Sequence, residues 1–528
     1  MNQLLFLIWL FLMAKSLLFW LYVWQLKEYH IGRVQDHFGT RAGRSIILNQ
    51  LVAGKLVLLV IVAVAPALSF LVFFLYSAEA VRIILRKGRV LRPALTIKTL
   101  ILGTVGAVLV LWYGSEVSAF SHAALWLLFF DLLSPAIFSV LVLAAQPLAV
   151  AGRNRILRAA AKKRAKLSHL KVVGITGSYG KTSTKEFASW IIGTKFRVAK
   201  TSRHQNSEVG VSYAILRNLK ETDEVLVAEM GAYGRGGVKL LCDIARPQIG
   251  VLTGISSQHL ATFGSQKLIT KTKFEIVSSL PKGGTAILNK DSALVAAEDP
   301  EHYNPKLGRV VWCSTRGKAD FVASDVRADR HKVSFQLSDG AHRVSCEVPV
   351  LGKHSVENLV LAAAVARELG MSMEEIAKAL TSMPPELSQL HLRKGIKNLT
   401  LIDSTYSANV VGVIADLEYL KLWEDRERFV VMPSLIELGS ESEKAHEMIG
   451  EKIAEVCQGA VICSRDGYPG ILKGAKRKGM GADRILLRES VSSIEEAIDA
   501  LTDPGDAVLL EGRVPSGLAE RLSIESST

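Results

Sequence analysis

Four apolar stretches within the first 150 residues constrain the fold of this chain more than any other feature. Each has about the twenty residues that an α-helix needs to cross the hydrocarbon core of a bilayer, or more. They are Leu4 to Leu26, Leu56 to Tyr76, Ala94 to Tyr113 and Ala123 to Val150. The sequence therefore predicts a membrane domain over residues 1–150 with about four transmembrane helices. The first stretch lacks a basic start and a small-residue cleavage site, so we do not expect a cleaved signal peptide.

Basic residues beside these stretches predict the orientation of the chain. The segment between the second and third stretches carries Arg82, Arg86, Lys87, Arg89 and Arg92, whereas the short link 115–121 carries only Glu116. Another basic run, from Arg153 to Lys166, follows the fourth stretch. Because Lys and Arg are retained on the cytoplasmic side, we expect a multi-pass protein of the cell (inner) membrane with its N-terminus inside. A basic linker, 151–170, would then lead into cytoplasmic catalytic domains.

The 27–50 loop disagrees with this orientation, because it falls outside yet contains Lys27, Arg33, Arg41 and Arg44. Either the first stretch is re-entrant, or this loop packs at the membrane surface against an anionic group. Two charged residues, Lys15 and Asp131, fall inside the predicted spans, where an uncompensated charge is expensive. They could pair with each other; the alternatives are a structural ion pair, a lysine that snorkels to the membrane surface, and a substrate role.

Composition excludes some function classes. The formal net charge is +14, but the basic residues cluster beside the apolar stretches, so we expect the lipid bilayer and no nucleic acid as partner. The five cysteines lie after residue 240 and form no CxxC pair. That spacing is typical of reduced cytosolic thiols, and it argues against a zinc ribbon or a disulfide framework.

A strand, a glycine-rich loop and a helix open the soluble half. Lys171 to Ile175 is a short β-branched run, TGSYGKTS follows, and a helical pattern begins at about Thr182. Backbone N–H groups of such a loop surround phosphates, while Lys181 reaches the terminal phosphates and Thr182 offers a hydroxyl to Mg²⁺. The spacing departs from the standard phosphate-binding loop, because Ile175 stands where the first glycine belongs. The predicted ATP-binding residues of the loop are Gly177, Ser178, Gly180, Lys181, Thr182 and Ser183.

A second apolar strand, Val225 to Ala228, ends in Glu229, like the acidic strand end that holds Mg²⁺ in P-loop enzymes. Further motifs follow in order: Gln205-Asn206, Gly210-Val211, EMGA from Glu229, His259-Leu260, TKFEI from Thr272, LNKDS from Leu288, GKHSVEN from Gly352, DSTYSAN from Asp403 and ELG from Glu437. Together with the loop they resemble the Mur ligase family, which makes the peptide stem of bacterial peptidoglycan. The resemblance is greatest to the members that add D-alanyl-D-alanine, and it covers about Lys171 to the C-terminus.

The resemblance implies roles for residues of the central domain. Lys181 and Thr182 bind ATP phosphate and Mg²⁺, Glu229 holds the first of two metal ions, and His259 helps to hold the second. Lys273 corresponds to the lysine that many members carry as a carbamate, which replaces a repelled ammonium by an oxygen ligand. The implied catalytic residues are therefore Lys181, His259 and Lys273, and the implied metal ligands are Thr182, Glu229, His259 and Lys273.

Two further segments match nucleotide-contacting motifs of the family. Asn289 and Asp291 match the adenine-side motif, and His354 and Asn358 match a second motif, in which Ser355 stands where asparagine is usual.

A last segment matches the one that closes over ATP and the incoming amine. It contains Asp403, Tyr406 and Asn409; the first is implied to contact ATP, and the other two, with Asn206, the substrates. Ser404, Ser407 and Val410 replace the usual aspartate, asparagine and proline, and Gln389 stands where an arginine is expected, with Arg393 nearby. These departures bear on the identity of the incoming amino compound more than on the fold.

The implied fold is an α-helical transmembrane region followed by two α/β domains. These are a P-loop NTPase-like central ATP-binding domain over residues 171–384 and a Rossmann-like C-terminal domain over residues 385–528, with a hinge near Met383. Strands that alternate with helical patterns agree with this, and those of the C-terminal domain are expected near Leu399, Phe429, Ala460 and Ala507.

The implied function is ATP-dependent formation of an amide (peptide) bond in peptidoglycan precursor synthesis. A muramoyl-peptide carboxylate is activated as an acyl phosphate, and an amino acid or D-Ala-D-Ala then attacks it. Because apolar stretches occupy the place of a UDP-binding domain, the acceptor is either UDP-linked or lipid-linked. Alternatives are a ligase of another acid acceptor, such as a folate or stem-amidating enzyme, a transporter or signalling protein driven by an ATPase, and an inactive membrane-anchored ATP-binding module.

Overall fold

A computed structural model describes residues 2–27, 29, 31–39, 41–85, 91–118, 120–202, 205–232, 234–256, 260–406, 408–436 and 438–524. The chain divides into two compact units, Met1–Asn154 and Arg155–Thr528. We call them the helical unit and the α/β unit, and each is described by itself.

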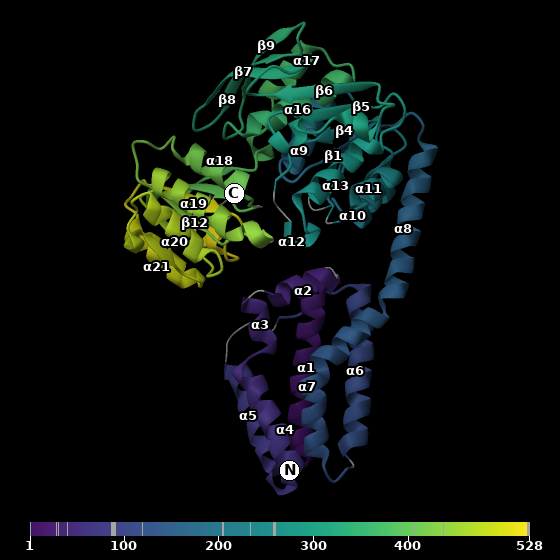
Figure 1. Cartoon of the computed structure of the whole chain (residues 1–528), viewed down its shortest axis with the longest axis vertical. Coiled ribbons are helices and arrows are strands. Elements are labelled where there is room, and N and C mark those ends of the chain that lie inside the picture. The colour runs from purple at the N-terminus through teal and green to yellow at the C-terminus, as the bar shows by residue number, and fades with distance from the viewer. Residues whose placement is uncertain are drawn as a thin grey trace. The chain divides into compact units, whose positions relative to one another are not determined.

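The described residues of the helical unit form helices and their connections (Figure 1). The helices are α1 (Asn2–Leu26), α2 (Ile31–Gly39), α3 (Arg41–Ile47), α4 (Gln50–Val64), α5 (Phe70–Leu85), α6 (Ile97–Ser118) and α7 (Ala123–Ala144), and α8 (Gln146–Lys166) begins in this unit. Buried aromatic and aliphatic side chains hold the long helices together, with Trp9 on α1 and Phe138 on α7 among the largest.

Five helical segments of the described residues are long and apolar enough to cross a membrane, where the sequence predicted four. They are Gln3–Leu26, Gly43–Val64, Pro66–Leu85, Ile97–Ser118 and Ala123–Lys166. The predicted second span, Leu56 to Tyr76, is not one helix, because the 3-10 turn η1 (Pro66–Ser69) separates α4 from α5. Proline at the first position of that turn cannot continue the hydrogen bonding of α4. An uninterrupted apolar composition concealed this break.

A buried ion cluster joins three helices of the helical unit. Lys55 Nζ on α4 lies 2.8 Å from Glu79 Oε2 on α5 and 2.6 Å from Asp131 Oδ2 on α7. The Tyr76 ring lies 5.4 Å from the same ammonium group. The predicted pairing of Asp131 with Lys15 is therefore wrong, since Asp131 pairs with Lys55. Lys55 was not predicted as the partner because it lies one residue before the predicted second span, which begins at Leu56.

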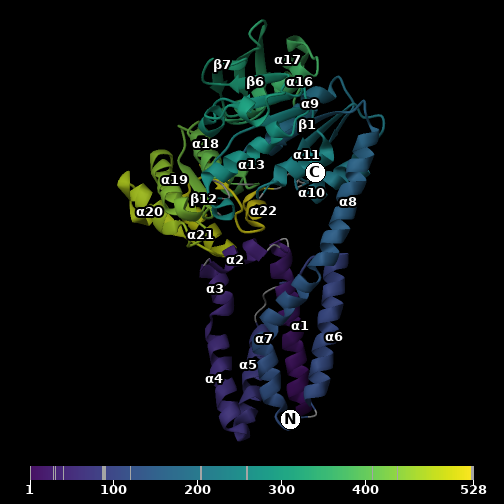
Figure 2. The same ribbon diagram turned by 45° about the vertical axis from the view of Figure 1, so that its right-hand side comes forward.

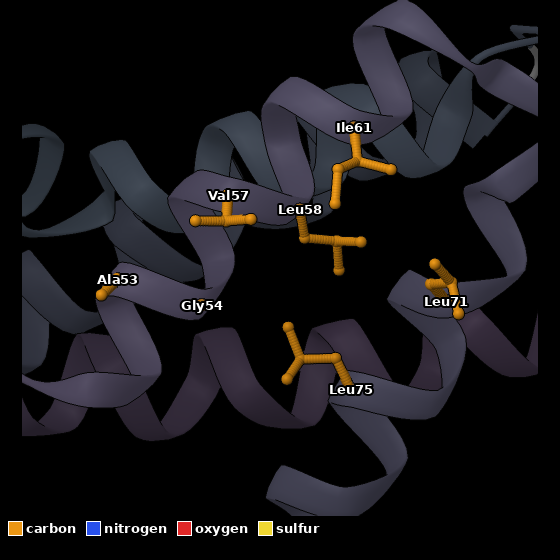
Figure 3. A pocket seen from close by; sticks show the side chains of 7 residues that line it. All are labelled: Ala53, Gly54, Val57, Leu58, Ile61, Leu71 and Leu75. Atoms are coloured by element: carbon orange, nitrogen blue, oxygen red, sulfur yellow. The ribbon is translucent and has the colours of Figure 1, made fainter.

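A cavity of about 550 Å³ lies between α4 and α5 (Figure 3). Its lining is apolar and consists of Ala53, Gly54, Val57, Leu58 and Ile61 from α4 and Leu71 and Leu75 from α5. These side chains include no acid, base or nucleophile, so the predicted chemistry must be sought in the α/β unit.

The second half of α8 is an integral part of the α/β unit. Its Leu157 and Ala160 are buried in the core of that unit. Lys163 donates to the carbonyls of Leu216 and Leu219 over 3.1 and 2.6 Å. Arg164, which is only 4% exposed, donates to the carbonyls of residues 167, 170 and 245. Two cations of the predicted basic linker thus satisfy buried carbonyls, in addition to any effect on orientation.

A nine-stranded sheet forms the first part of the α/β unit, in the order β2-β3-β1-β4-β5-β6-β7-β8-β9. The strands are β1 (Lys171–Thr176), β2 (Val198–Lys200), β3 (Val225–Glu229), β4 (Ile249–Leu252), β5 (Thr285–Asn289), β6 (Arg309–Ser314), β7 (Phe321–Ala328), β8 (Val333–Ser338) and β9 (Arg343–Val348). Pairing is parallel as far as β7 and antiparallel from β7 to β9.

Helices cover both faces of this sheet, as parallel strands require. One face packs against α9 (Lys181–Gly193), α16 (Ser355–Glu368) and α17 (Met373–Thr381). The other packs against α8, α11 (Gly237–Ala245) and α13 (Gln266–Ser278). The shorter helices are α10 (Glu208–Tyr213), α12 (Leu260–Phe263), α14 (Ala293–Ala296) and α15 (Pro300–Tyr303). The predicted strand, loop and helix around Gly177 are thus β1, the connection 177–180 and α9.

A six-stranded sheet follows, in the order β10-β11-β15-β12-β13-β14, with β10 antiparallel and the others parallel. Its strands are β10 (His391–Lys394), β11 (Thr400–Ser404), β12 (Arg428–Met432), β13 (Gly459–Ile462), β14 (Ile485–Leu487) and β15 (Ala507–Glu511). Its helices are α18 (Val410–Leu420), α19 (Ser442–Val456), α20 (Tyr468–Arg477), α21 (Val491–Leu501) and α22 (Leu518–Leu522) (Figure 2). The four predicted strands correspond to β11, β12, β13 and β15.

The carboxyl ends of parallel strands are where open α/β sheets bind ligands. In the first sheet these ends carry the loop after β1, Glu229 as the last residue of β3 and Asn289 as the last residue of β5. In the second they carry Ser404 and Glu511, which are register partners on β11 and β15. The candidate site therefore begins at these positions.

Candidate active site

Two glycines shape the connection between β1 and α9. Gly177 has φ of 153° and Gly180 has φ of 76°, values that L residues with a side chain rarely adopt. A Cβ at Gly177 would lie 2.1 Å from Thr253 Oγ1, and a Cβ at Gly180 would lie 2.3 Å from Asn358 Oδ1. The loop therefore has no space for side chains at these positions, and its backbone lies against the neighbouring segments.

Lys181 is the first residue of α9 and folds back over the loop. Its Nζ donates to the carbonyls of Gly177 and Ser178 over 2.8 and 3.1 Å. Burial lowers the pKa of Lys181 from its ordinary value, while the nearby carboxylate of Glu229 acts in the opposite direction. The ammonium group thus lies at the mouth of a loop whose backbone amides suit phosphate.

Glu229 is the centre of the polar contacts beside this loop. It is 3% exposed at the end of β3, and its Oε2 and Oε1 accept hydrogen bonds of 3.0 Å from Thr182 Oγ1 and Asn206 Nδ2. Its backbone N–H donates to Thr201 Oγ1 over 3.0 Å, which fixes the strand end. A carboxylate, a hydroxyl and an amide oxygen are ligand types that Mg²⁺ accepts, so these residues fit the predicted metal.

Lys185 is a residue of this cluster that sequence reasoning missed. It is fully buried on α9, one turn after Lys181, and its Nζ lies 3.0 Å from Glu186 Oε1 and 3.6 Å from Glu229 Oε2. The signal was its i, i+4 spacing from Lys181, which places both ammonium groups on one side of the helix. Lys185 offsets part of the negative charge that Glu229 would otherwise bury alone.

Lys273 lies on α13 and is only 2% exposed. Burial, and then the positive charge of Lys181, lowers the pKa of Lys273 to about 7. The carboxylate of the neighbouring Glu275 accepts hydrogen bonds from the backbone N–H groups of Gly236 and Lys239 at the start of α11. A substantial fraction of the Lys273 amine is therefore neutral near pH 7.

The predicted adenine-side residues are joined to the loop by hydrogen bonds. Asn289 Nδ2 donates to the carbonyl of Thr253 over 2.6 Å, and the Thr253 side chain lies against Gly177. Asn289 Oδ1 accepts the backbone N–H of Asp291 over 2.9 Å. The carboxylate of Asp291 in turn accepts hydrogen bonds from residues 314 and 315. Asn289 and Asp291 are thus fixed by the β4 and β6 ends.

Asn358 is joined to the loop from the other side. Its Oδ1 accepts a hydrogen bond of 3.1 Å from Thr184 Oγ1 on α9 and lies beside Gly180. Another missed residue, Glu357, lies between Asn289 Nδ2 at 3.3 Å and Arg316 Nη2 at 3.0 Å. Burial raises the pKa of Glu357 from its ordinary value. Its acidic side chain at a helix start was indistinguishable in sequence from a helix-capping residue.

The predicted closing segment lies on the second sheet. Asp403 Oδ2 pairs with Arg393 Nη2 at 2.8 Å. Arg393 thus brings a guanidinium group to this segment, although Gln389 stands where the arginine was expected. Asn409 Oδ1 accepts the backbone N–H of Gly412 over 3.1 Å and caps α18. Tyr406 lies in the turn between β11 and α18. His354 lies beside α18, which follows this segment, with His354 Nε2 3.6 Å from Asp416 Oδ1.

His259 lies outside the described residues, so its predicted metal role stays a prediction. Within the part of the chain that the structure describes, no group of three or more His, Cys, Asp or Glu side chains could hold a metal ion. The oxygen ligands that the structure does assemble are those around Glu229.

Comparisons with known proteins agree with this geometry. Residues 175–366 match the family described as Mur ligase middle domain. A UDP-N-acetylmuramoyl-tripeptide–D-alanyl-D-alanine ligase of Mycobacterium bovis is 32% identical over 372 residues, which cover 66% of this chain and 71% of the relative. The corresponding enzyme of a Synechocystis species is 28% identical over 354 residues, with 67% and 74% covered.

Two solved structures share the fold of the α/β unit. MurF from Acinetobacter baumannii has a TM-score of 0.62 at 25% identity, with 68% of this chain and 78% of that chain covered. MurF ligase from Thermotoga maritima in complex with ADP has a TM-score of 0.60 at 25% identity, with 70% and 83% covered. The residues around the loop, the family match and the extent of the identity lead to one conclusion: the chain belongs to the Mur ligase family.

Proposed function

We propose that this chain is an ATP-dependent ligase that joins D-alanyl-D-alanine to the carboxylate of a muramoyl-peptide precursor of peptidoglycan. The observation that carries the proposal is the arrangement of Lys181, Thr182 and Glu229 at one strand edge, with the buried Lys273 within electrostatic reach of Lys181. Relatives that are named for this reaction support the choice of amine and of acceptor peptide.

ATP would lie on the loop 177–183, with its phosphates on the backbone amides and Lys181. Asn289 and Asp291 would contact the adenine side of ATP. His354 and Asn358, from the second nucleotide-contacting motif, and Asp403, from the closing segment, would also contact the nucleotide. Thr182 and Glu229 would hold Mg²⁺, which neutralises charge on the transferring phosphoryl group when it is bound. The solved relative with ADP supports a nucleotide on this fold.

A carbamate on Lys273 would complete a second metal site with His259. The neutral amine is the form that adds CO₂, and a pKa of about 7 makes that form available at neutral pH. Addition removes a buried cation beside Lys181 and supplies oxygen ligands. NMR of protein prepared with isotope-labelled bicarbonate tests this, since a carbamate signal must be present and must vanish in Lys273→Met.

The reaction needs no nucleophile from the chain. The acceptor carboxylate attacks the γ-phosphorus, the bond to ADP breaks, and an acyl phosphate forms. The amine then attacks the acyl carbon, the C–N bond forms, and the C–O bond breaks with release of phosphate. Lys181 stabilises the negative charge on the phosphoryl oxygens, so catalysis is chiefly positioning and electrostatics. Asn206, Tyr406 and Asn409 would contact the substrates.

We also propose that the helical unit crosses the membrane five times. Gln25 on α1 exchanges hydrogen bonds with the backbone of Ala94 before α6, and Gln146 of α8 donates to the carbonyl of Tyr29. These contacts gather the end of α1, the start of α6 and the start of α8 at one end of the helical unit (Figure 1). Helices α2 and α3 also lie at this end (Figure 1).

This arrangement removes the conflict in the predicted orientation. Among the described residues, Lys27 after α1, Arg44 on α3, Arg82 in the last turn of α5 and Arg92 before α6 belong to the same end as the start of α8, whereas Glu116 lies near the other end of α6. The basic end would face the cytoplasm together with the catalytic domains. An odd number of crossings then places the N-terminus outside, in place of the expected inside location.

The acceptor would be either a lipid-linked or a UDP-linked muramoyl peptide. A lipid-linked muramoyl peptide would reach the catalytic half from the bilayer that the apolar helices would cross. A UDP-linked one would arrive from the cytosol. The names of the relatives support the UDP-linked acceptor, whereas the apolar helices that precede the catalytic half in the sequence are the observation that suggests the lipid-linked one.

Full-length protein in nanodiscs, offered each acceptor with ATP and D-Ala-D-Ala, tests the function. We expect a product larger by the dipeptide, detected by mass spectrometry, and none from Lys181→Ala, which should still insert in the membrane. Exclusive use of the UDP-linked acceptor would eliminate lipid delivery. ATP binding without product from any acceptor would instead identify an inactive ATP-binding module.

A further inference from the structure

Two carboxyl groups meet in the interior of the C-terminal domain. Glu511 ends β15 and is 1% exposed, and Asp416 on α18 is 5% exposed. Ser404, the register partner of Glu511, donates its hydroxyl to Asp416 Oδ2 over 2.6 Å. Both carboxyl oxygens of Glu511 are buried without a hydrogen bond from a described donor. A proton on one of the two acids would supply the missing hydrogen bond between them.

The charges make such a proton necessary. Two ionised carboxylates in contact repel each other, and burial removes the water that would screen them. Burial first, and then the charge of Asp416, raises the pKa of Glu511 well above its ordinary range. Burial therefore favours the protonated form of Glu511, and Asp416 accepts the hydrogen bond from Ser404.

Asp416 also faces another domain. His354 Nε2 lies 3.6 Å from Asp416 Oδ1, and His354 comes from the central domain at the start of α16. Its ring packs on Gly352, where a Cβ would lie 2.5 Å from His354 Cε1. One turn further along α16, Asn358 contacts Thr184 and the phosphate-binding loop. A continuous series of contacts thus leads from Glu511 to the nucleotide segment.

Other charged groups nearby belong to a second contact between the same domains. Tyr419 on α18 donates its hydroxyl to the carbonyl of Arg330, whose Nε donates to the carbonyl of Leu422. Arg330 also pairs with Asp425. Asp329 and Asp416 both act on the Tyr419 phenol, and Glu357 is the nearest acid to His354 along α16. None of these groups supplies the proton that the Glu511–Asp416 pair needs.

We propose that Glu511 and Asp416 share one proton and that this pair positions His354, so that the C-terminal domain is fastened to the nucleotide segment through the contact between Asp416 and His354. Glu511 and Asp416 are positioning residues, since they act on ATP only through His354. The inference rests on the proposed function in one respect, the nucleotide contact of His354. Loss of the shared proton at alkaline pH would repel the two acids and release the contact.

The test uses two substitutions at one position in the full-length protein. Glu511→Gln keeps the shape and the hydrogen-bond donor of a protonated acid, whereas Glu511→Ala removes both. We expect Glu511→Gln to bind ATP as the natural chain does at about pH 7, and Glu511→Ala to bind about tenfold more weakly. Asp416→Asn should weaken ATP binding similarly, while Asp425→Asn, at the second contact, should not. Calorimetry of ATP binding without acceptor measures this independently of ligation.

A second measurement follows the proton itself. Folded Glu511 binds a proton that the unfolded chain releases, so the unfolding midpoint of the natural chain should fall relative to Glu511→Gln as pH rises from about 6 to about 9. The infrared band of a protonated carboxyl group should also disappear in that variant. Equal weakening by Gln and Ala, or an unchanged infrared band, would overturn the proposal. A natural chain that binds ATP and shows this pH dependence of its unfolding midpoint, but forms no product, would overturn the ligase function alone.

Discussion

Thr182 Oγ1 donates a hydrogen bond of 3.0 Å to Glu229 Oε2, which joins the first turn of α9 to the end of β3. This contact fixes the only two metal ligands of the prediction that lie within hydrogen-bond distance of each other among the described residues. The hydroxyl and the carboxylate are separated by 47 positions in the chain, and the parallel pairing of β1 with β3 brings them together.

Glu229→Gln is expected to lower the ligation rate at least about 100-fold, because the amide cannot supply the negative charge that holds Mg²⁺. The substitution also leaves the buried Lys185 without its second carboxylate. Phosphate release and product formation at saturating ATP measure the effect. Glu221→Gln, in an exposed connection of the same domain, is the matched control and should behave as the natural chain. Full activity of Glu229→Gln would contradict the metal assignment.

Lys273→Met is expected to stabilise the α/β unit near neutral pH in buffer free of CO₂. The folded pKa of about 7 lies below the ordinary value of 10.5, so the unfolded chain binds more protons between these limits. The unfolding free energy of the natural chain therefore rises with pH across that window, by up to about 1.4 kcal/mol per pH unit. The methionine variant lacks this slope and the burial cost at low pH.

Denaturant midpoints at several pH values measure the difference. Lys271→Met is the control, because Lys271 lies on the same helix but is exposed. The interpretation of Lys273 as a buried, largely neutral amine fails when the natural chain and Lys273→Met show parallel pH dependence.

Lys55→Met is expected to destabilise the helical unit by about 3–5 kcal/mol, because Glu79 and Asp131 would remain buried without their shared cation. Lys15→Met is the matched control, since Lys15 is half-buried on α1 and does not pair with Asp131. Tryptophan fluorescence during unfolding in detergent reports on the unit, which contains Trp9 and Trp24 in its core. A loss in Lys55→Met no larger than in Lys15→Met would show that the cluster is solvated.

The sequence predicted most of the α/β unit because its signals are local. The loop glycines, the strand before them and the acid at the end of β3 each lie within a few residues of the pattern that identifies them. The resemblance to a family then predicted site residues that lie far apart in the chain, such as Asn289 and Asn358. Asn289 is hydrogen-bonded to Thr253 and Asn358 to Thr184, on either side of the loop.

The sequence did not predict contacts that depend on tertiary packing. Lys55 and Glu511 are ionisable residues whose partners lie on other elements, and nothing near them in sequence distinguishes them from surface residues. Lys185 had only its i, i+4 spacing from Lys181 as a signal, and its contact with Glu229 depends on the packing of α9 against β3. The break at Pro66 was missed for another reason. A span is predicted from the length and the composition of an apolar run, and a single proline such as Pro66 within a long run changes neither enough to be noticed.

Asn409→Ala is expected to cost about 1 kcal/mol of stability, because the side chain caps α18 by accepting the N–H of Gly412. Asn409→Ser should keep the cap and most of the stability. The pair separates a capping role from the predicted substrate role. If Asn409 also contacts the incoming amine, the serine variant should raise the KM for D-Ala-D-Ala while its unfolding midpoint stays near that of the natural chain. Normal kinetics in the serine variant would leave Asn409 as a cap only.

The number of membrane crossings is decided by the side on which the N-terminus lies. Single cysteines introduced at Gln3, Leu91 and Ser118 occupy exposed positions at the start of α1, before α6 and at the end of α6. The five natural cysteines are buried in the α/β unit, so a membrane-impermeant maleimide should give little background.

With five crossings, intact cells stripped of their outer layers should be labelled at Gln3→Cys and Ser118→Cys, and at Leu91→Cys only after lysis. With four crossings, Gln3→Cys would be protected like Leu91→Cys, since an even number returns both ends of the helical unit to the cytoplasm. Labelling at Ser118→Cys alone would therefore restore the four-span arrangement and the conflict of the basic 27–50 loop. Labelling at both outer positions would place that loop, the segment before α6 and the α/β unit on one side, where their positive charges belong.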